Sequence, residues 1–211
     1  MIATASIDWI SIGGAVEPWQ RLGLVTSQAD GDGCAQIPLF GTGIEVDTTG
    51  RVGSRRLVMS GVDPQLTSLD GVAVEVRDVP PPLFAVHPLG ARSIDHVVIA
   101  TDDLLRTSGA IADATGAALK RVREVGEVRQ GFHRLGGLIV EVVERAGLSA
   151  GPAGVWGIVL VVDDLDAACV SLGEAVVGEP RAAVQPGRRI ATLRAVAGLD
   201  VAVALISPDP R

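Results

Sequence analysis

One acidic residue lies where the sequence otherwise predicts a buried β-strand. Glu141 is the only polar side chain in the run 138–143, which is apolar at successive positions, as in a central strand buried on both faces. A buried carboxylate without a partner costs several kcal/mol. We therefore expect one of three situations for Glu141: a metal ligand or general base, an exposed edge strand, or a structural contact. The structural partners could be Arg129, Arg134 or His96.

A histidine on an earlier predicted strand could act together with this carboxylate. His96 alternates with Ile94 and Val98 on one face of a strand predicted at 94–100. Imidazole and carboxylate can bind a metal or transfer a proton, although a lone histidine on such a face is also often a hydrogen-bonded core residue. Two protein ligands alone would bind a divalent ion weakly, because catalytic zinc sites normally supply three.

Other polar and aromatic residues could complete a site. His133 lies beside Phe132 in a third predicted strand, Glu45 lies in the opening segment, and His87 follows a run of prolines. We predict that His133 lines a pocket with His96 and Glu141. The remaining predicted pocket residues are Gln130 and Trp156, where Trp156 either offers a flat face for stacking or is buried in the core.

The totals exclude several classes of protein. The formal charge of −7 argues against nucleic acid, whose binding proteins need basic surfaces. No apolar run approaches the roughly 20 residues that span a membrane, and the start of the chain does not resemble a signal peptide. Cys34 and Cys169 lie far apart and form no metal or disulfide motif. We expect a reduced, cytoplasmic protein with one large or two small domains in its 211 residues.

Turns and hydrophobic alternation divide the chain into two parts. In the first part we predict strands at 6–12, 55–60 and 71–77, two short strands within 34–46, and a short helix at 16–24. Three consecutive prolines then begin a linker at 80–92. The predicted domains are therefore 1–79 and 93–211.

The second part contains two similar units, 93–146 and 154–207. Each is predicted to run strand, helix, strand, strand, strand, with a pair of aspartates at the N-cap of its helix. The segment VVIATDDL at 97–104 matches IVLVVDDL at 158–165, an offset of 61 residues (158 minus 97). The opening segment repeats the pattern weakly. SIDW at 6–9 is similar to SIDH at 93–96, and GIEV at 43–46 is similar to IVEV at 139–142.

Tandem units that begin with IDHVVIATDDL and end with IVEVVE resemble the vicinal oxygen chelate superfamily, which includes glyoxalases, extradiol dioxygenases and bleomycin-binding proteins. The resemblance covers roughly 93–207 and is poor over 1–90. It implies an α+β fold of tandem βαβββ modules, whose mixed sheets curve into a cup with helices on the outer faces. Residues 1–79 would form a degenerate half of the same kind.

The resemblance also implies roles for individual residues. His96 occupies the metal-ligand position of a first strand, and Glu141 occupies the ligand position of a last strand, where it would also be the catalytic residue. The corresponding residues of the next unit, Gly157 and Ala202, cannot bind metal. In the opening segment the corresponding residues would be Trp9 and Glu45.

Three functions remain open from the sequence. The first is a lyase, isomerase or dioxygenase in which His96 and Glu141 hold one divalent ion (zinc, iron, manganese, nickel or magnesium). The second is a metal-free protein that binds or sequesters a small molecule in the same cup. The third is an interaction module of ferredoxin-like βαββαβ units, which the single predicted helix per unit disfavours. Because members of the superfamily often pair cups across subunits, the resemblance also allows a homodimer.

Overall fold

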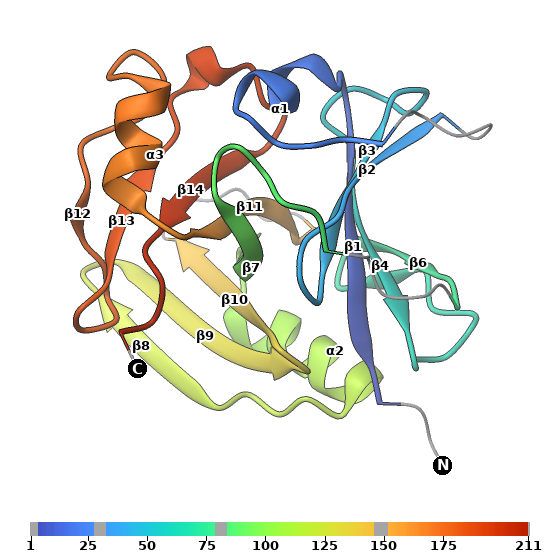
Figure 1. The fold of residues 1–211 in the computed structure, drawn as a ribbon. Coiled ribbons are helices and arrows are strands. Elements are labelled where there is room, and N and C mark those ends of the chain that lie inside the picture. The colour runs from blue at the N-terminus through green and yellow to red at the C-terminus, as the bar shows by residue number, and fades with distance from the viewer. Residues whose placement is uncertain (1–3, 28–32, 79–83, 146–151, 211) are drawn as a thin grey trace.

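The computed structural model describes residues 4–27, 33–78, 84–145 and 152–210, which form two mixed β-sheets (Figure 1). Residues 4–78 supply a six-stranded sheet, and residues 91–206 supply an eight-stranded sheet. The α+β class with curled mixed sheets is as predicted. No helix in the described part of the chain is long and apolar enough to cross a membrane.

The eight-stranded sheet consists of two units that meet along an antiparallel pair of strands. These strands, β7 and β11, lie at the centre, and each has the last strand of its own unit parallel to it on the outer side. The strand order is β12-β13-β14-β11-β7-β10-β9-β8. The elements are β7 (Ala91–Thr101), α2 (Leu104–Thr115), β8 (Arg121–Val125), β9 (Val128–Leu135), β10 (Leu138–Arg145), β11 (Gly154–Val162), α3 (Leu165–Leu172), β12 (Arg181–Ala182), β13 (Arg189–Thr192), the 3₁₀ helix η1 (Ala195–Ala197) and β14 (Ala202–Ile206).

The six-stranded sheet repeats this arrangement with fewer elements. Strands β1 and β4 form a central antiparallel pair, β3 lies parallel to β1, and β6 lies parallel to β4. The strand order is β2-β3-β1-β4-β6-β5. The elements are β1 (Ser6–Gly13), α1 (Glu17–Arg21), β2 (Cys34–Ile37), β3 (Gly43–Asp47), β4 (Arg55–Ser60), β5 (Ser68–Leu69) and β6 (Val72–Val76).

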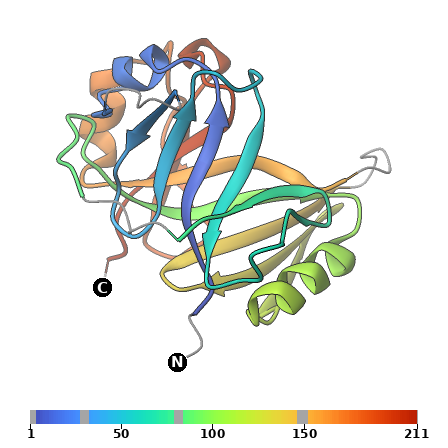
Figure 2. The ribbon, with the colours of Figure 1, turned by 90° about the vertical axis from the view of Figure 1, so that its right-hand side faces the viewer.

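One face of the eight-stranded sheet carries the helices and the N-terminal half. A single apolar cluster contains Val97 and Val140 of this sheet, Leu104 and Leu165 of the helices, and Leu57 of the N-terminal sheet. Figure 2 shows the N-terminal sheet in front of the eight-stranded one, with strands that run across those behind it. The opposite, concave face is therefore left for a second set of side chains.

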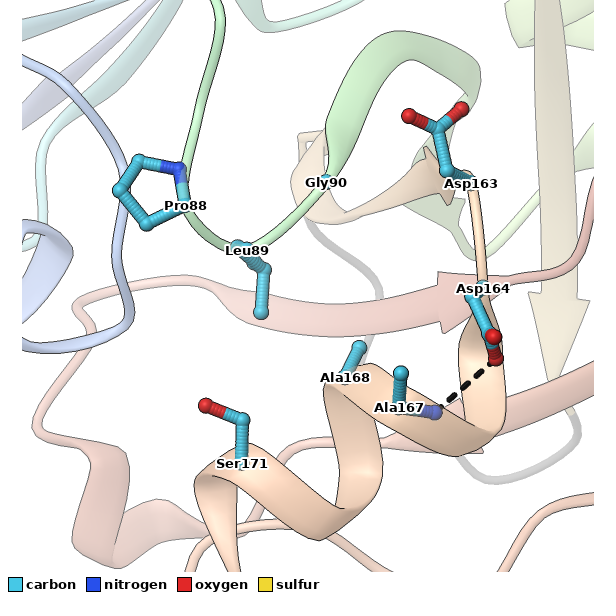
Figure 3. Close-up of a pocket in the computed structure, with 8 residues that line it drawn as sticks. All are labelled: Pro88, Leu89, Gly90, Asp163, Asp164, Ala167, Ala168 and Ser171. Carbon is cyan, nitrogen blue, oxygen red and sulfur yellow. Dashed lines mark hydrogen bonds between the residues drawn. The ribbon is translucent and has the colours of Figure 1, made fainter.

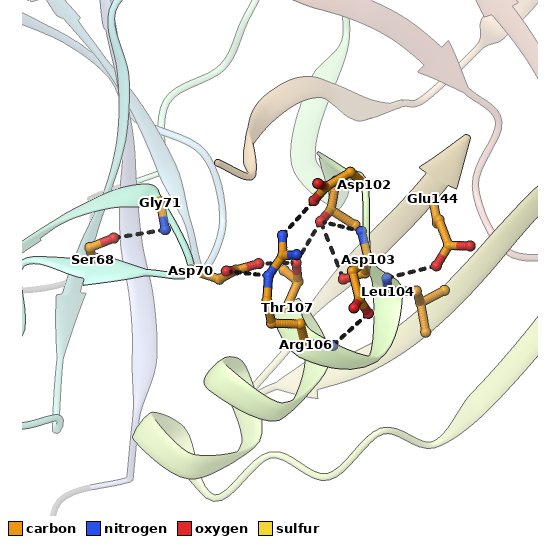
Figure 4. A network of polar contacts seen from close by, with 10 residues as sticks. Ser68, Asp70, Gly71, Asp102, Asp103, Leu104, Arg106, Thr107 and Glu144 are labelled. Atoms are coloured by element: carbon orange, nitrogen blue, oxygen red, sulfur yellow. Dashed lines mark hydrogen bonds and ion pairs between the residues drawn. The ribbon is translucent and has the colours of Figure 1, made fainter. Parts of the chain in front are cut away.

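A polar network joins the two halves at the start of α2 (Figure 4). Asp70, in the turn between β5 and β6, accepts hydrogen bonds from Arg106 Nε at 2.7 Å and from Thr107 Oγ1 at 2.5 Å. Burial opposes the ionisation of Asp70, but these two bonds outweigh it and hold the pKa of its carboxyl below the usual value. The network anchors a turn of one sheet to a helix of the other.

The predicted helix starts are confirmed, and two details of the prediction are wrong. Asp103 is the N-cap of α2 and accepts a hydrogen bond from Arg106 N, and Asp164 is the equivalent residue of α3. Of the helix predicted at 16–24, only Glu17–Arg21 is helical, as α1. The strand predicted at 94–100 is longer, since β7 spans Ala91–Thr101.

Candidate functional site

The concave face of the eight-stranded sheet brings His96 and Glu141 together. Strands β7 and β10 are parallel neighbours in which Ile139 lies opposite His96, so that Glu141 follows two residues later on the same face. The His96 Nε2 and Glu141 Oε2 atoms are 3.3 Å apart. Glu141 is 8% exposed, and the edge-strand interpretation of this residue is wrong because β10 lies between β7 and β9.

Gln130 completes the environment of the Glu141 carboxylate. It lies on β9, and its Nε2 donates a hydrogen bond to Glu141 Oε1 at 2.7 Å. The two arginines considered from the sequence do not contact Glu141: Arg129 pairs with Glu144 at 3.0 Å, and Arg134 lies exposed on β9. Both oxygens of Glu141 are thus held by a ring nitrogen and an amide, without a permanent cation in contact.

A β-bulge at Asp95 orients the imidazole. His96 pairs with Val159 and Ile94 pairs with Leu160, so Asp95 is the extra residue on β7. His96 Nδ1 donates to Asp95 Oδ2 at 2.8 Å, and a carboxylate in this position fixes the orientation of the ring.

Arg188 holds Asp95 in turn. Its Nη1 donates to Asp95 Oδ1 at 2.6 Å, and its Nε donates to the carbonyl oxygen of Ser207 at 2.8 Å. Sequence reasoning missed both Asp95 and Arg188. The signal for Asp95 was a second carboxylate within an apolar strand, as at Glu141, whereas Arg188 lies in a turn that no strand pattern places.

The two carboxyl groups have opposite pKa shifts. Burial raises the pKa of Glu141 above its usual value, and the opposing effects of His96 and Gln130 are weaker. Burial also opposes the ionisation of Asp95, but the bonds from His96 and Arg188 prevail and lower its pKa. The surroundings thus favour ionisation of Asp95 and oppose ionisation of Glu141.

The second unit has small or apolar residues at the matching positions. Gly157 lies opposite Ala202 as His96 lies opposite Ile139, so the residue equivalent to Glu141 is Ala204. The assignment of Ala202, made from the constant offset, is two residues out of register. Ala204 packs with Val159 and Ile206 in a small apolar cluster that is separate from the main core.

The donor set does not fit a resident divalent ion. His96 and Glu141 supply two donor groups, whereas Gly157 and Ala204 supply none. Among the residues that the structure describes, no group of three or more His, Cys, Asp and Glu side chains is placed to hold a metal. Catalytic zinc sites normally have three protein ligands.

The two other candidate histidines lie apart from this cluster. His133 faces α2, is 1% exposed and bonds through Nδ1 to the Ala117 carbonyl at 2.8 Å, and burial lowers its pKa. His87 accepts a hydrogen bond from Val25 N and donates to the Pro38 carbonyl, so it fastens the linker to the N-terminal half. Trp156 is the extra residue of a second bulge and is 57% exposed, so its interpretation as a core residue is wrong.

The N-terminal sheet has acidic residues at the positions that match Glu141. Trp9 lies opposite Gly43 as His96 lies opposite Ile139, which makes Glu45 the equivalent of Glu141, and Glu75 is the equivalent of Ala204. Glu45 is 1% exposed and pairs with Arg77 at 2.5 Å. Arg77 also pairs with Glu75 at 2.7 Å. Both carboxylates are therefore neutralised within the sheet.

A hollow of about 310 Å³ lies elsewhere, between the linker and α3 (Figure 3). It is lined by residues 88–90 and by one side of α3 with Asp163 and Asp164 before it. Asp164 caps the helix, and Asp163 pairs with Arg92. No residue predicted from the sequence to form the site lines this hollow.

Comparisons with known proteins give no close relative. No family model matches the chain, and no curated protein matches it. Among solved structures, methylmalonyl-CoA epimerase from Mycobacterium tuberculosis is 20% identical with a TM-score of 0.49, and the match covers 57% of this chain and 91% of that one. A variant of the Streptomyces coelicolor enzyme, in complex with 2-nitronate-propionyl-CoA, is 21% identical with a TM-score of 0.48, with 57% and 96% covered.

A hypothetical protein from Bacillus halodurans is 16% identical with a TM-score of 0.48, and the match covers 56% of this chain and 96% of that one. Methylmalonyl-CoA epimerase is a member of the vicinal oxygen chelate superfamily that the sequence resembles. These identities and TM-scores are too low to assign a function to this chain.

Proposed function

We propose that this protein binds a small molecule on the concave face of its eight-stranded sheet, without a resident metal. The observation that carries the proposal is the direct contact of His96 with Glu141 on a half-polar, half-apolar surface. A ligand there would place a polar group at Glu141 and an apolar part over Val159 and Ala204. Ligand sites commonly combine an apolar lining with a few placed polar groups.

The donor geometry supports the metal-free form of this proposal. One oxygen of Glu141 accepts a hydrogen bond from the amide of Gln130, the other faces His96, and burial raises the pKa of the carboxyl group and so opposes its ionisation. A metal ligand must be deprotonated. The enzyme class that needs a divalent ion is thus supported less by these residues than a binding protein is.

A ligand screen with two variants tests the proposal. We expect ligand-detected NMR with the wild-type protein to find small molecules whose affinity falls about 10-fold in Glu141→Gln, because a hydrogen bond to the carboxyl group is lost and such a contact is worth about 1.4 kcal/mol. Glu124→Gln is the matched control, since Glu124 is exposed on β8. Binding should persist in EDTA.

Two outcomes would contradict the proposal. One is equal binding to wild type and Glu141→Gln, which would move the ligand site elsewhere. The other is near-stoichiometric zinc or manganese in equilibrium dialysis, lost in His96→Ala and Glu141→Ala, which would favour the metal-dependent enzyme.

The hydrogen-bond relay favours proton transfer as a second candidate function. His96 contacts a carboxyl group through each ring nitrogen: Glu141, with a raised pKa, and Asp95, with a lowered one. Such an arrangement suits a general acid and base that moves a proton next to a carbonyl group, as in a metal-independent isomerase. A bound ligand with such a proton would exchange it for deuterium faster in wild type than in His96→Gln. Equal exchange rates would indicate that the protein binds the ligand without transferring a proton.

We also propose that residues 4–78 are a degenerate half of the glyoxalase type. The support is the shared register of β1 with β3 and of β7 with β10, together with the similar segments SIDW and SIDH. In this view Arg77 has taken over the neutralisation of Glu45, so the N-terminal face no longer needs a ligand. Residues 80–92 would then be the linker between the two halves.

A further inference from the structure

The outer strands of the concave face carry several arginines. In the β8 and β9 ladder, Arg123 lies opposite Gln130 and Arg121 lies opposite Phe132. Residues opposite each other in a ladder share a face of the sheet. Gln130 contacts Glu141, so both arginines belong to the same concave face as the site. Arg134, opposite Ile139, belongs to it by the same argument.

These arginines form no hydrogen bond or ion pair within the described part of the chain, although Arg123 interacts electrostatically with Glu141. The Nη1 atom of Arg123 is buried. A buried donor that leaves its hydrogen bond unmade is costly, and more so when it is charged. The other buried guanidinium on this face, Arg188, is bonded to Asp95 and to Ser207.

The charge of this face is opposite to that of the whole chain. Arg188 neutralises Asp95, and among the described residues Glu141 is the acidic group that interacts with Arg123. The described part of this face thus has three unpaired arginines, Arg121, Arg123 and Arg134, and this one carboxyl group, although the whole protein has a formal charge of −7. The face is therefore a local positive region that would attract and hold an anion.

We propose that the ligand of the concave face is a small organic anion, a carboxylate or a phosphate ester, whose charged end binds Arg123. The inference rests on the proposed function and names its ligand class. The planar fork of a guanidinium group matches the two oxygens of a carboxylate or phosphate. The apolar body of the ligand then extends toward Val159 and Ala204, and Arg121 and Arg134 attract the anion from the outer strands.

The test uses three probes that share one ring and differ in charge: benzoate, phenyl phosphate and the neutral benzamide. Calorimetry and ligand-detected NMR with the full chain should show at least one anion binding about 10-fold more tightly than benzamide, as expected for one charge-assisted pair. Preference for benzoate identifies a carboxylate ligand, and preference for phenyl phosphate identifies a phosphate ester. The preference should decrease with added salt.

Two arginine variants locate the contact. Arg123→Gln should lose the preference for the anion, and Arg123→Lys should keep part of it, because the charge remains and the fork does not. Arg129→Gln is the matched control: Arg129 lies opposite Glu124 on the other face of β9 and pairs with Glu144. Arg123 makes no hydrogen bond or ion pair among the described residues and acts on Glu141 only electrostatically, so its variants should change the free energy of unfolding by no more than about 0.5 kcal/mol.

The outcomes separate this inference from the proposed function. If benzamide binds as tightly as both anions, and its binding depends on Glu141 but not on Arg123, the ligand is not selected as an anion. The proposal that the concave face binds a small molecule would then still hold. An anion preference that survives in Arg123→Gln, or that Arg129→Gln abolishes equally, also overturns the inference. Anion binding that needs Arg123 but is unchanged in Glu141→Gln would keep the anion and overturn the proposed role of Glu141.

Discussion

The two sheets place a buried glutamate at the same position and surround it differently. In β3, Glu45 lies two residues after the residue opposite Trp9. In β10, Glu141 lies two residues after the residue opposite His96. Glu45 is paired with Arg77, an ion pair between a strand and the residue just after β6. Glu141 has His96 and Gln130, neither of which carries a fixed charge.

The difference separates a carboxylate paired with a fixed cation from one held by a histidine and an amide. A fixed cation keeps a buried carboxylate ionised and its lone pairs occupied, so that it stabilises the fold but has little capacity for a ligand. A histidine and an amide leave the charge state of the carboxyl group adjustable. The same distinction holds for the arginines, since Arg56 pairs with Asp47 and Glu75 while Arg123 forms no hydrogen bond or ion pair among the described residues.

The largest effect is expected from breaking the N-terminal ion pair. Arg77→Leu leaves Glu45 buried without a cation, and breaking a fully buried pair costs about 3–5 kcal/mol. Arg77 is partly exposed, so we expect the free energy of unfolding to fall by about 2–3 kcal/mol. Because the halves share one core, chemical denaturation should remain a single transition.

Arg134→Leu is the control for that measurement. Arg134 is exposed and without a partner in the described chain, so its replacement should change the free energy of unfolding by less than about 0.5 kcal/mol. Equal losses in the two variants would show that the contact of Arg77 with Glu45 contributes nothing specific.

The sequence was sufficient for the strands and for the central pair of the site. Turn residues and alternation place β4 at 55–60 as observed, and a carboxylate within the apolar run 138–143 identifies Glu141. Strand register could not be read, because the constant offset hides two extra residues before β14, and Ala202 was chosen in place of Ala204. The face of His133 was also undetermined, since Phe132 and His133 are adjacent and point to opposite sides of β9.

Contacts between distant segments were beyond sequence patterns for a physical reason. The Asp95 bulge depends on pairing with β11, which local propensity does not encode. Arg188 reaches Asp95 from a turn more than ninety positions away, as its separation of 93 residues shows. The ion pairs of the N-terminal sheet likewise join strands whose neighbours are set by tertiary packing.

The smallest stability effect is expected at Glu141, and its sign depends on pH. Because burial raises the pKa of this carboxyl group, its contribution is fully present below the unfolded value of 4.5 and is lost as the pH rises through the folded pKa. At pH 7–8, Glu141→Gln should therefore unfold at the same denaturant concentration as wild type or slightly higher, within about 0.5 kcal/mol. The advantage of the glutamine should shrink toward pH 4, as the wild-type carboxyl group becomes neutral as well.

Urea denaturation of the two proteins at pH 4, 6 and 8 measures this difference. A loss of 2 kcal/mol or more at pH 8, about as large as that expected for Arg77→Leu, would contradict it. Glu141 would then be a structural carboxylate like Glu45, held ionised by its surroundings. A loss of ligand affinity without a loss of stability would instead separate the two positions, because a buried carboxylate that holds the fold, as Glu45 does, cannot be neutralised without a loss of stability.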